Sequence, residues 1–159
     1  MPTRSKAPAR VSASPGPTAF PAGFGWIGNP QLVLRVPSVV EVDLPVLAPP
    51  LRHHGAVPGG TNVSVVEVLA PGEARIRSWE RGVEGETLCC GTGSAVAAAW
   101  LAQTDGVRSW RLHTAGGETV RVSLALDAEG AWHDLWLYGP VRRLGTVQPD
   151  PSLLLRLQG

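Results

Sequence analysis

Apolar and polar positions alternate along several segments of the chain, which is the period of half-buried β-strands. Between these segments lies the stretch 45–60, which is rich in Pro, Gly and His and predicts a loop. The alternating pattern covers residues 31–44, with a break at Pro37-Ser38, and residues 62–69 and 73–79, which flank a turn at Pro71-Gly72. The first segment predicts two short strands or one bent strand, and the other two predict a hairpin.

The segment Ser94 to Ala102 has a different character, because it is apolar on every side and carries no charge. Its composition favours a helix, and a helix over residues 92–104 would be about 20 Å long. A helix that is apolar all round is buried all round, so the sheet should wrap it. Three further alternating segments (107–114, 119–126 and 131–138) predict an antiparallel meander. We therefore expect an α+β fold, a curved antiparallel or mixed sheet around one central buried helix.

Length and composition limit the class of protein. The 159 residues are enough for one domain, and with 43% hydrophobic and 17% charged residues the chain should form a globule. A net charge of +1 gives no reason to expect nucleic acid or a membrane surface as partner, and no apolar run reaches the roughly 20 residues that span a bilayer. The two cysteines are adjacent and cannot build a disulfide framework, which favours a cytoplasmic location.

The first 24 residues contain five prolines, three basic residues and no acidic residue. They also lack the apolar stretch of a secretory signal, so we expect a disordered tail that adds nothing to the core. The domain should then cover residues 25–149, with a C-terminal extension over residues 150–159.

The candidate chemistry lies at Cys90-Gly91-Thr92-Gly93, directly before the predicted helix. Free N–H groups and the helix dipole at such a position favour a thiolate and bind carboxylates. A buried cysteine that merely packs is the competing interpretation, but Gly91 and Gly93 would let a ligand approach the backbone. Cys89 should point to the opposite face and pack. We therefore expect Cys90 to be alkylated faster than Cys89.

Glu80 and Arg81 stand at a predicted strand end, at the mouth of the loop that leads to Cys90. An arginine there could clamp a carboxylate, and the glutamate could orient an ammonium group or exchange a proton with the thiol. Taken alone, the pair could equally be solvated surface charges. Asn29 and Asn62 are turn residues by spacing alone. No carboxylate or second cysteine lies at ligand spacing from the histidines, so we expect no metal site.

Several motifs together resemble one known family. They are Gly28-Asn29-Pro30, Pro50-Leu51-Arg52-His53-His54, Thr61-Asn62-Val63 and the run from Trp79 through Leu88 to Cys90-Gly91-Thr92-Gly93. These motifs resemble the C-terminal half of diaminopimelate epimerase. They follow one another in the same order as in that family, and the resemblance covers most of residues 25–145. Members of that family are isomerases that interconvert LL- and meso-diaminopimelate in lysine and cell-wall synthesis, without pyridoxal phosphate or any other cofactor.

The resemblance implies a role for each candidate residue. Cys90 would be one of two catalytic bases that flank the α-carbon of a diaminopimelate-like amino acid, and Glu80 would assist the thiol and help to seat the substrate. The reacting carboxylate would be held by Gly91 and Thr92. The distal carboxylate and ammonium would be bound by Arg81, Asn62 and Asn29.

The same resemblance shows two departures, and both concern the other side of the reaction. In the family, the second catalytic cysteine comes from an N-terminal half. Cys89 cannot replace that cysteine, because Cys89 lies on the same segment as Cys90. The family also has a histidine where this chain has Gln31. Three hypotheses follow: a split epimerase completed by a separate N-terminal half, a non-catalytic remnant that binds amino acids or carboxylates, and, ranked last, a homodimer with two Cys90 thiols in one site.

Overall fold

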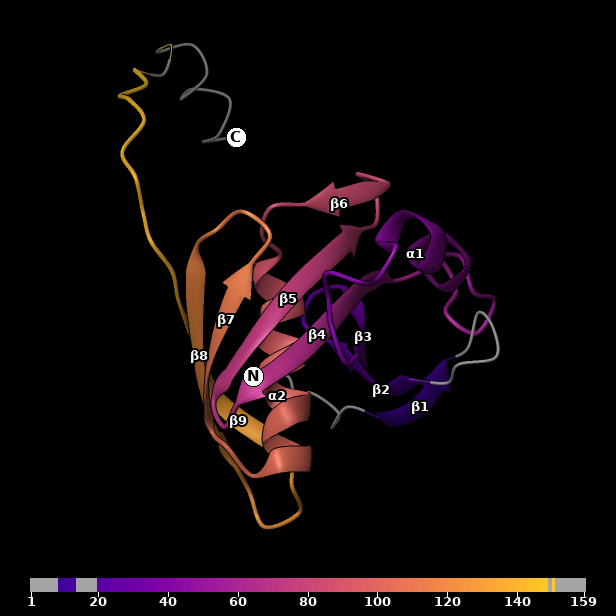
Figure 1. Cartoon of the computed structure of the whole chain (residues 1–159). Helices are drawn as coiled ribbons and strands as arrows, with labels where there is room; N and C mark the ends of the chain where they lie inside the picture. Colours follow the sequence, from indigo (N-terminus) through magenta and orange to yellow (C-terminus); the bar gives the residue numbers. More distant parts are fainter. Residues whose placement is uncertain (1–8, 14–19, 149, 151–159) are drawn as a thin grey trace, which may run out of the picture.

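A single curled sheet organises the protein (Figure 1). The computed structural model describes residues 9–13, 20–148 and 150. Within them the sheet has nine strands: β1 (Ala9–Ala13), β2 (Phe20–Trp26), β3 (Pro30–Arg35), β4 (Asn62–Ala70), β5 (Glu73–Glu80), β6 (Gly85–Thr87), β7 (Ser109–Thr114), β8 (Thr119–Leu126) and β9 (Trp132–Tyr138). Two helices accompany them, α1 (Leu44–Arg52) and α2 (Gly91–Asp105).

The strands lie in the order β1-β2-β3-β4-β5-β7-β8-β9, with β6 paired to the end of β5. The pairs β3–β4 and β5–β7 are parallel, and the remaining pairs are antiparallel. Parallel neighbours need a crossover connection: α1 lies in the first, and β6 and α2 lie in the second. The expected meander of three strands is confirmed as β7, β8 and β9.

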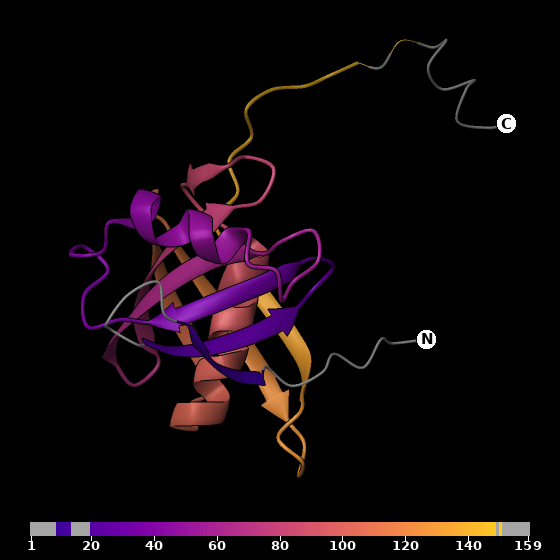
Figure 2. The same ribbon diagram turned by 90° about the vertical axis from the view of Figure 1, so that its right-hand side faces the viewer.

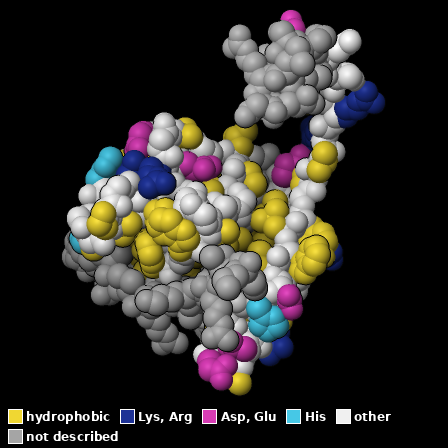
Figure 3. Space-filling model, turned by 180° about the vertical axis from the view of Figure 1, so that it is seen from behind, with side chains coloured by type: hydrophobic (Ala, Val, Ile, Leu, Met, Phe, Trp, Pro, Cys, Tyr) yellow, Lys and Arg dark blue, Asp and Glu magenta, His cyan; other side chains and the backbone are white. Residues whose placement is uncertain are grey.

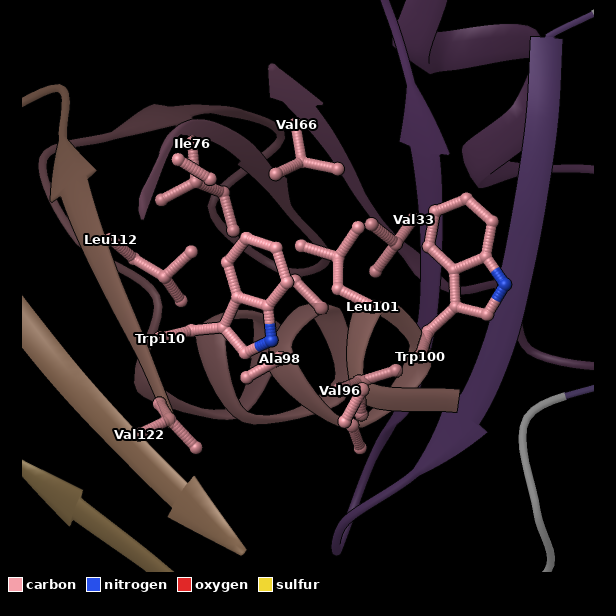
Figure 4. Close-up of a cluster of buried hydrophobic side chains, with 14 of the residues drawn as sticks. Val33, Val66, Ile76, Val96, Ala98, Trp100, Leu101, Trp110, Leu112 and Val122 are labelled. Atoms are coloured by element: carbon pink, nitrogen blue, oxygen red, sulfur yellow. The ribbon is translucent and has the colours of Figure 1, made fainter. Parts of the chain in front are cut away.

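Helix α2 is enclosed by the sheet, as its apolar sequence predicts (Figure 2). Its residues from Gly93 to Ala102 are all buried. Trp110 and Leu112 of β7 pack against it from one side and Val33 of β3 from the other (Figure 4). The α+β class with one central buried helix is thus confirmed.

The chain segment 45–60, expected to be a loop, begins with a helix instead. The side chain of Asp43 accepts a hydrogen bond from Val46 N and caps the start of α1. Pro45 stands in the first turn, where a missing N–H costs nothing. Burial of Leu44, Ala48 and Leu51 along one face outweighs the two prolines inside the helix. The spacing of these three residues, four and then three positions apart, is typical of one face of a helix.

The alternating residues 39–44 form no strand, contrary to expectation. Side chains from neighbouring strands bind the backbone there instead: Val39 N donates to Glu67 Oε2 at 3.1 Å. Arg77 Nη1 donates to the carbonyl oxygens of Val39 and Val42 at 2.6 and 2.8 Å. Buried backbone groups need partners, and here charged side chains supply them. A strand neighbour is therefore not required.

The expected tail over residues 1–24 differs from the structure where the structure describes it. Residues 9–13 form β1, which pairs with β2, and residues 20–24 belong to β2 itself. Ala22 is buried, and Gly23 lies directly against the Trp100 ring of α2. The sheet therefore extends through residues that composition alone assigned to a tail. Apart from Asp150, the expected C-terminal extension lies outside the described residues.

Several large apolar side chains remain exposed, among them Trp26, Leu88 and Trp136. Seen from behind, hydrophobic side chains gather at the surface in several groups (Figure 3). Neither helix of the described part is long and apolar enough to cross a membrane.

Candidate functional site

The N-terminus of α2 carries the thiol that the sequence singled out. Cys90 is the N-cap residue in an extended conformation, and its Sγ accepts a hydrogen bond from Gly93 N at 3.4 Å. An added Cβ at Gly93 would approach Ser64 Oγ to 2.9 Å and Cys90 Sγ to 3.2 Å. Only glycine fits this close approach without displacing a neighbour. The first turn of α2 therefore packs closely against the sulfur, and Gly93 makes this contact possible.

Two opposing effects act on Cys90. Burial leaves the residue 5% exposed and raises the pKa of the thiol, and the nearby Glu80 carboxylate acts in the same direction. Hydrogen bonds from Thr92 and from Gly93 N lower the pKa, but by less. The net shift is upward, so the helix start does not by itself produce a thiolate. Sequence reasoning included the helix start but could not weigh how deeply the sulfur would be buried.

Cys89 is exposed rather than packed, contrary to expectation. Partial burial raises the pKa of its thiol as well, with a further contribution from Glu80. The two adjacent thiols thus have different surroundings, one open to solvent and the other at the start of α2.

A polar chain connects the end of β2 to the helix start. Gln31 is completely buried, and its Nε2 donates to Asn29 Oδ1 at 3.0 Å and to Thr92 Oγ1 at 2.8 Å. Thr92 Oγ1 in turn lies 3.6 Å from Cys90 Sγ. Asn29, Thr92 and Cys90, which are far apart in the sequence, are therefore brought together, and Gln31 is the link.

Glu80 ends β5 and is half-buried. Its Oε1 accepts a hydrogen bond from Thr87 Oγ1 at 2.6 Å, across the paired strands β5 and β6. Because Thr87 stands three residues before Cys90, this bond ties the segment that carries the thiol to the carboxylate. Thr87 was not singled out by sequence, since β6 is only three residues long and has no alternation to detect.

Asn62 and Arg81 meet through the backbone. Asn62 is 2% exposed, and its Oδ1 accepts a hydrogen bond from Arg81 N at 2.7 Å. Asn62 also stands opposite Gln31 in the parallel pair β3–β4. The Arg81 guanidinium is held only loosely, with the carbonyl oxygens of Gly59 and Gly60 at 3.4 and 3.5 Å from Nη1. Both distances are long for a hydrogen bond, so these contacts constrain the guanidinium only weakly.

The turn that follows Arg81 is fixed to α1. Glu84 Oε1 accepts hydrogen bonds from Arg52 Nη2 at 2.7 Å and from Gly82 N at 3.0 Å. Arg52 is buried, and a buried guanidinium that lost the Glu84 carboxylate would be left as an unpaired charge. The ion pair therefore holds Glu84 in position. The loop between Glu80 and Gly85 therefore has a defined shape.

Of the expected site residues, Asn29, Thr92 and Cys90 form one hydrogen-bonded chain, Glu80 lies beside the thiol, and Asn62 holds the Arg81 backbone. Gly91 is exposed at the helix start. Gln31 had attracted attention only as a departure from a motif, and nothing in the pattern of the sequence indicated that it would be a buried link. In the part of the chain that the structure describes, no group of three His, Cys, Asp or Glu residues gathers as metal ligands would.

Comparison with known proteins identifies the family of the chain. The family model of diaminopimelate epimerase matches residues 26–133. Among curated relatives, diaminopimelate epimerase of Gemmatimonas aurantiaca is 42% identical over 108 residues, which are 67% of this chain and 37% of the relative. That of Phocaeicola vulgatus is 44% identical over 89 residues, 55% of this chain and 31% of the relative.

Among solved structures, a Bacillus anthracis phenazine biosynthesis protein of the PhzF family matches with a TM-score of 0.46 and 19% identity, over 65% of this chain and 32% of that chain. The chain spans about a third of the length of three curated relatives, between 31% and 38%. The matched region nevertheless covers every residue of the candidate site. This chain belongs to the diaminopimelate epimerase family.

Proposed function

We propose that this domain supplies one side of a cofactor-independent amino-acid epimerase site, with Cys90 as one of its two proton-transferring thiols and diaminopimelate as the substrate. The observation that carries the proposal is the position of Cys90 Sγ, at the N-cap of a buried helix and within reach of Thr92, Gly93 N and Glu80. Sequence similarity to diaminopimelate epimerases over these residues supports it.

The chemistry asks for a strong base, because the α-proton of an amino acid is only weakly acidic. Burial makes Cys90 such a base once it is deprotonated, since the same desolvation that raises its pKa destabilises the thiolate. One thiolate removes the α-proton from one face, and a thiol on the opposite face returns a proton. In this proposal a separate polypeptide segment, carrying an epimerase N-terminal half, would supply the second thiol.

Substrate contacts follow from what each group can donate. In the first turn of α2, the N–H groups of Gly91 and Thr92 lack intrahelical partners and would hold the reacting carboxylate. The loosely held Arg81 would bind the distal carboxylate, assisted by the amide groups of Asn62 and Asn29. Glu80, already beside the thiol, would assist proton transfer and help to seat the substrate. Reduced thiols also suit the cytoplasm as the place of action.

The test is hydrogen exchange at the α-carbon of diaminopimelate in deuterated water, followed together with stereochemistry. A split enzyme should be silent alone and should invert its substrate when a polypeptide containing an epimerase N-terminal half is added. In that reconstituted state we expect Cys90→Ala to abolish inversion, because one of the two thiols is then lacking, and the matched variant Cys89→Ala to retain it. If Cys90→Ala inverted diaminopimelate as fast as Cys89→Ala, Cys90 would not be one of the two catalytic thiols.

A second candidate, a non-catalytic binding module, is favoured by one observation: Cys90 is buried and its pKa is raised. Such a module would bind diaminopimelate, measurable by calorimetry, yet never exchange its α-hydrogen, with or without a partner. Inversion by the purified chain alone would instead support a homodimer with two Cys90 thiols. These outcomes separate the three hypotheses in one set of measurements.

A further inference from the structure

The side chain of Gln31 directs a hydrogen-bond chain of defined polarity. An amide nitrogen only donates, and Gln31 Nε2 donates to both Asn29 Oδ1 and Thr92 Oγ1. Its carbonyl oxygen, Oε1, is buried and has no hydrogen-bond partner among the described residues. Leaving a buried oxygen unpaired is costly. In this orientation the Gln31 amide makes both donated hydrogen bonds although its oxygen stays without a partner.

The polarity passes to Thr92. A hydroxyl has a single hydrogen, and Thr92 Oγ1 uses a lone pair to accept from Gln31. Its own hydrogen is then available to the neighbour on the other side, Cys90 Sγ, at 3.6 Å. Rotating the amide by half a turn would reverse this polarity, but it would bring Gln31 Oε1 against Asn29 Oδ1 at about the 3.0 Å of the present bond, acceptor against acceptor. While Asn29 presents its Oδ1 to Gln31, it therefore favours the orientation that the Gln31 amide has.

We propose that Gln31 is a positioning residue that holds the Thr92 hydroxyl with its hydrogen toward Cys90 Sγ and so favours the thiolate. Gln31 does not touch the sulfur and acts through Thr92. The catalytic meaning of this relay rests on the proposed function, whereas its effect on the thiol can be measured without substrate.

Other groups around the sulfur act independently of Gln31. Glu80, at the end of β5, is the charged group that bears on Cys90 among the described residues, and it opposes the thiolate. Gly93 N donates to Sγ from within α2. Both should remain in place when Gln31 is replaced, because neither is bonded to it.

The experiment uses the full chain in a Cys89→Ala background, so that a single thiol reports. The pKa of Cys90 is obtained from the pH dependence of its alkylation by iodoacetamide and from ultraviolet absorbance of the thiolate. We compare Gln31→Met, which keeps length and removes the donor, with Thr92→Val, which removes the hydroxyl. Thr92→Ser, which keeps the hydroxyl, is the conservative control.

We expect Gln31→Met and Thr92→Val each to raise the pKa of Cys90 and to slow alkylation roughly two- to tenfold at a pH below that pKa, as the loss of one hydrogen bond implies. Combined, the two substitutions should add nothing beyond Thr92→Val alone. Thr92→Ser should leave the pKa where it is. Gln31→Leu offers a second variant should the methionine disturb folding, which circular dichroism would reveal.

An unchanged or lowered pKa in Gln31→Met would overturn the relay. So would an effect of Gln31→Met that persists undiminished in the Thr92→Val background, because it would then act through packing. Failure of the proposed function looks different: no exchange of diaminopimelate under any condition, while the pKa response to Gln31→Met is retained.

Discussion

At the scale of single residues, the site depends on a balance at one sulfur. The helix start and the Thr92 hydroxyl favour the thiolate, and burial together with Glu80 favours the thiol. Burial dominates, because the residue is only 5% exposed. The balance at Cys90 therefore favours the protonated thiol, the form that the proposed paired-thiol mechanism needs on its proton-donating side.

The same balance reverses the reactivity expected from sequence. Burial raises the pKa of both thiols, so the pKa direction does not separate them. Access does, because Cys89 is exposed and Cys90 is buried. We therefore expect iodoacetamide to label Cys89 faster than Cys90 in the folded chain, measured by mass spectrometry of the labelled peptides after a short pulse.

In denaturant the two rates should converge, because adjacent cysteines in an unfolded chain have similar surroundings. Faster labelling of Cys90 in the folded state would show that access to its sulfur is greater than the packing of α2 allows.

At the scale of elements, the sequence was informative where one signal acted alone. The apolar run of α2 and the alternation of β4, β5 and β8 predicted these elements nearly to the residue. Helix α1 was missed because its three prolines outweighed, in local reasoning, the burial of Leu44, Ala48 and Leu51. For residues 39–44 the alternation predicted a strand that does not form, because Glu67 and Arg77, which are remote in the sequence, bind the backbone there. Such contacts are invisible to any local pattern.

The contact between β2 and α2 gives a prediction for an element. A Cβ added at Gly23 would come within 2.4 Å of the Trp100 ring, a distance that real side chains do not reach. Trp100 is itself buried and cannot swing outward. We expect Gly23→Ala to lower the free energy of unfolding by about 1–3 kcal/mol, the usual cost of overpacking a core, measured by urea denaturation.

Gly55→Ala is the matched control, because nothing lies within 4 Å of its added Cβ. Its unfolding free energy should stay within about 0.5 kcal/mol of the parent chain. Combining Gly23→Ala with Trp100→Leu should cost less than the sum of the two single changes, since the smaller side chain makes room. Strict additivity would argue against the contact.

At the scale of the whole molecule, the candidate site is assembled from segments that the fold brings together. Asn29 lies between β2 and β3, Glu80 ends β5 and Cys90 directly precedes α2 as its N-cap. Motif resemblance assigned these residues to one site, and the structure shows how strand order and the two parallel pairs place them side by side. The part that sequence could not supply is physical detail: the burial of the sulfur, the direction of the Gln31 amide and the anchoring of Glu84 by Arg52.

Two carboxyl groups with lowered pKa, Glu73 in β5 and Glu84 in the turn after it, make the free energy of unfolding depend on pH. Hydrogen bonding to His113, and then the charge of Arg111, lowers the pKa of Glu73. Bonds from Gly82 N and Arg52 lower that of Glu84. Carboxyls whose pKa is lower in the folded than in the unfolded state stabilise the fold above their unfolded pKa, near 4.5. That stability is lost as the pH falls through the folded values.

We therefore expect the urea midpoint of unfolding to fall as the pH drops from about 5 to about 3. Glu73→Gln and Glu84→Gln should each lower the midpoint at neutral pH and flatten its fall in acid, because an amide has no proton to gain. A slope as steep in both variants as in the parent chain would contradict the assignment of these two carboxyls.

The enclosure of α2 by the sheet has a consequence for molecular recognition. A reactive atom carried on a surface loop must be ordered each time a guest arrives, and that ordering weakens affinity. Here the sulfur belongs to the N-cap residue of a helix that is buried in the interior. The fold therefore fixes the position of the sulfur in advance, and a ligand that bound at this helix start would not have to order the residue that carries the thiol.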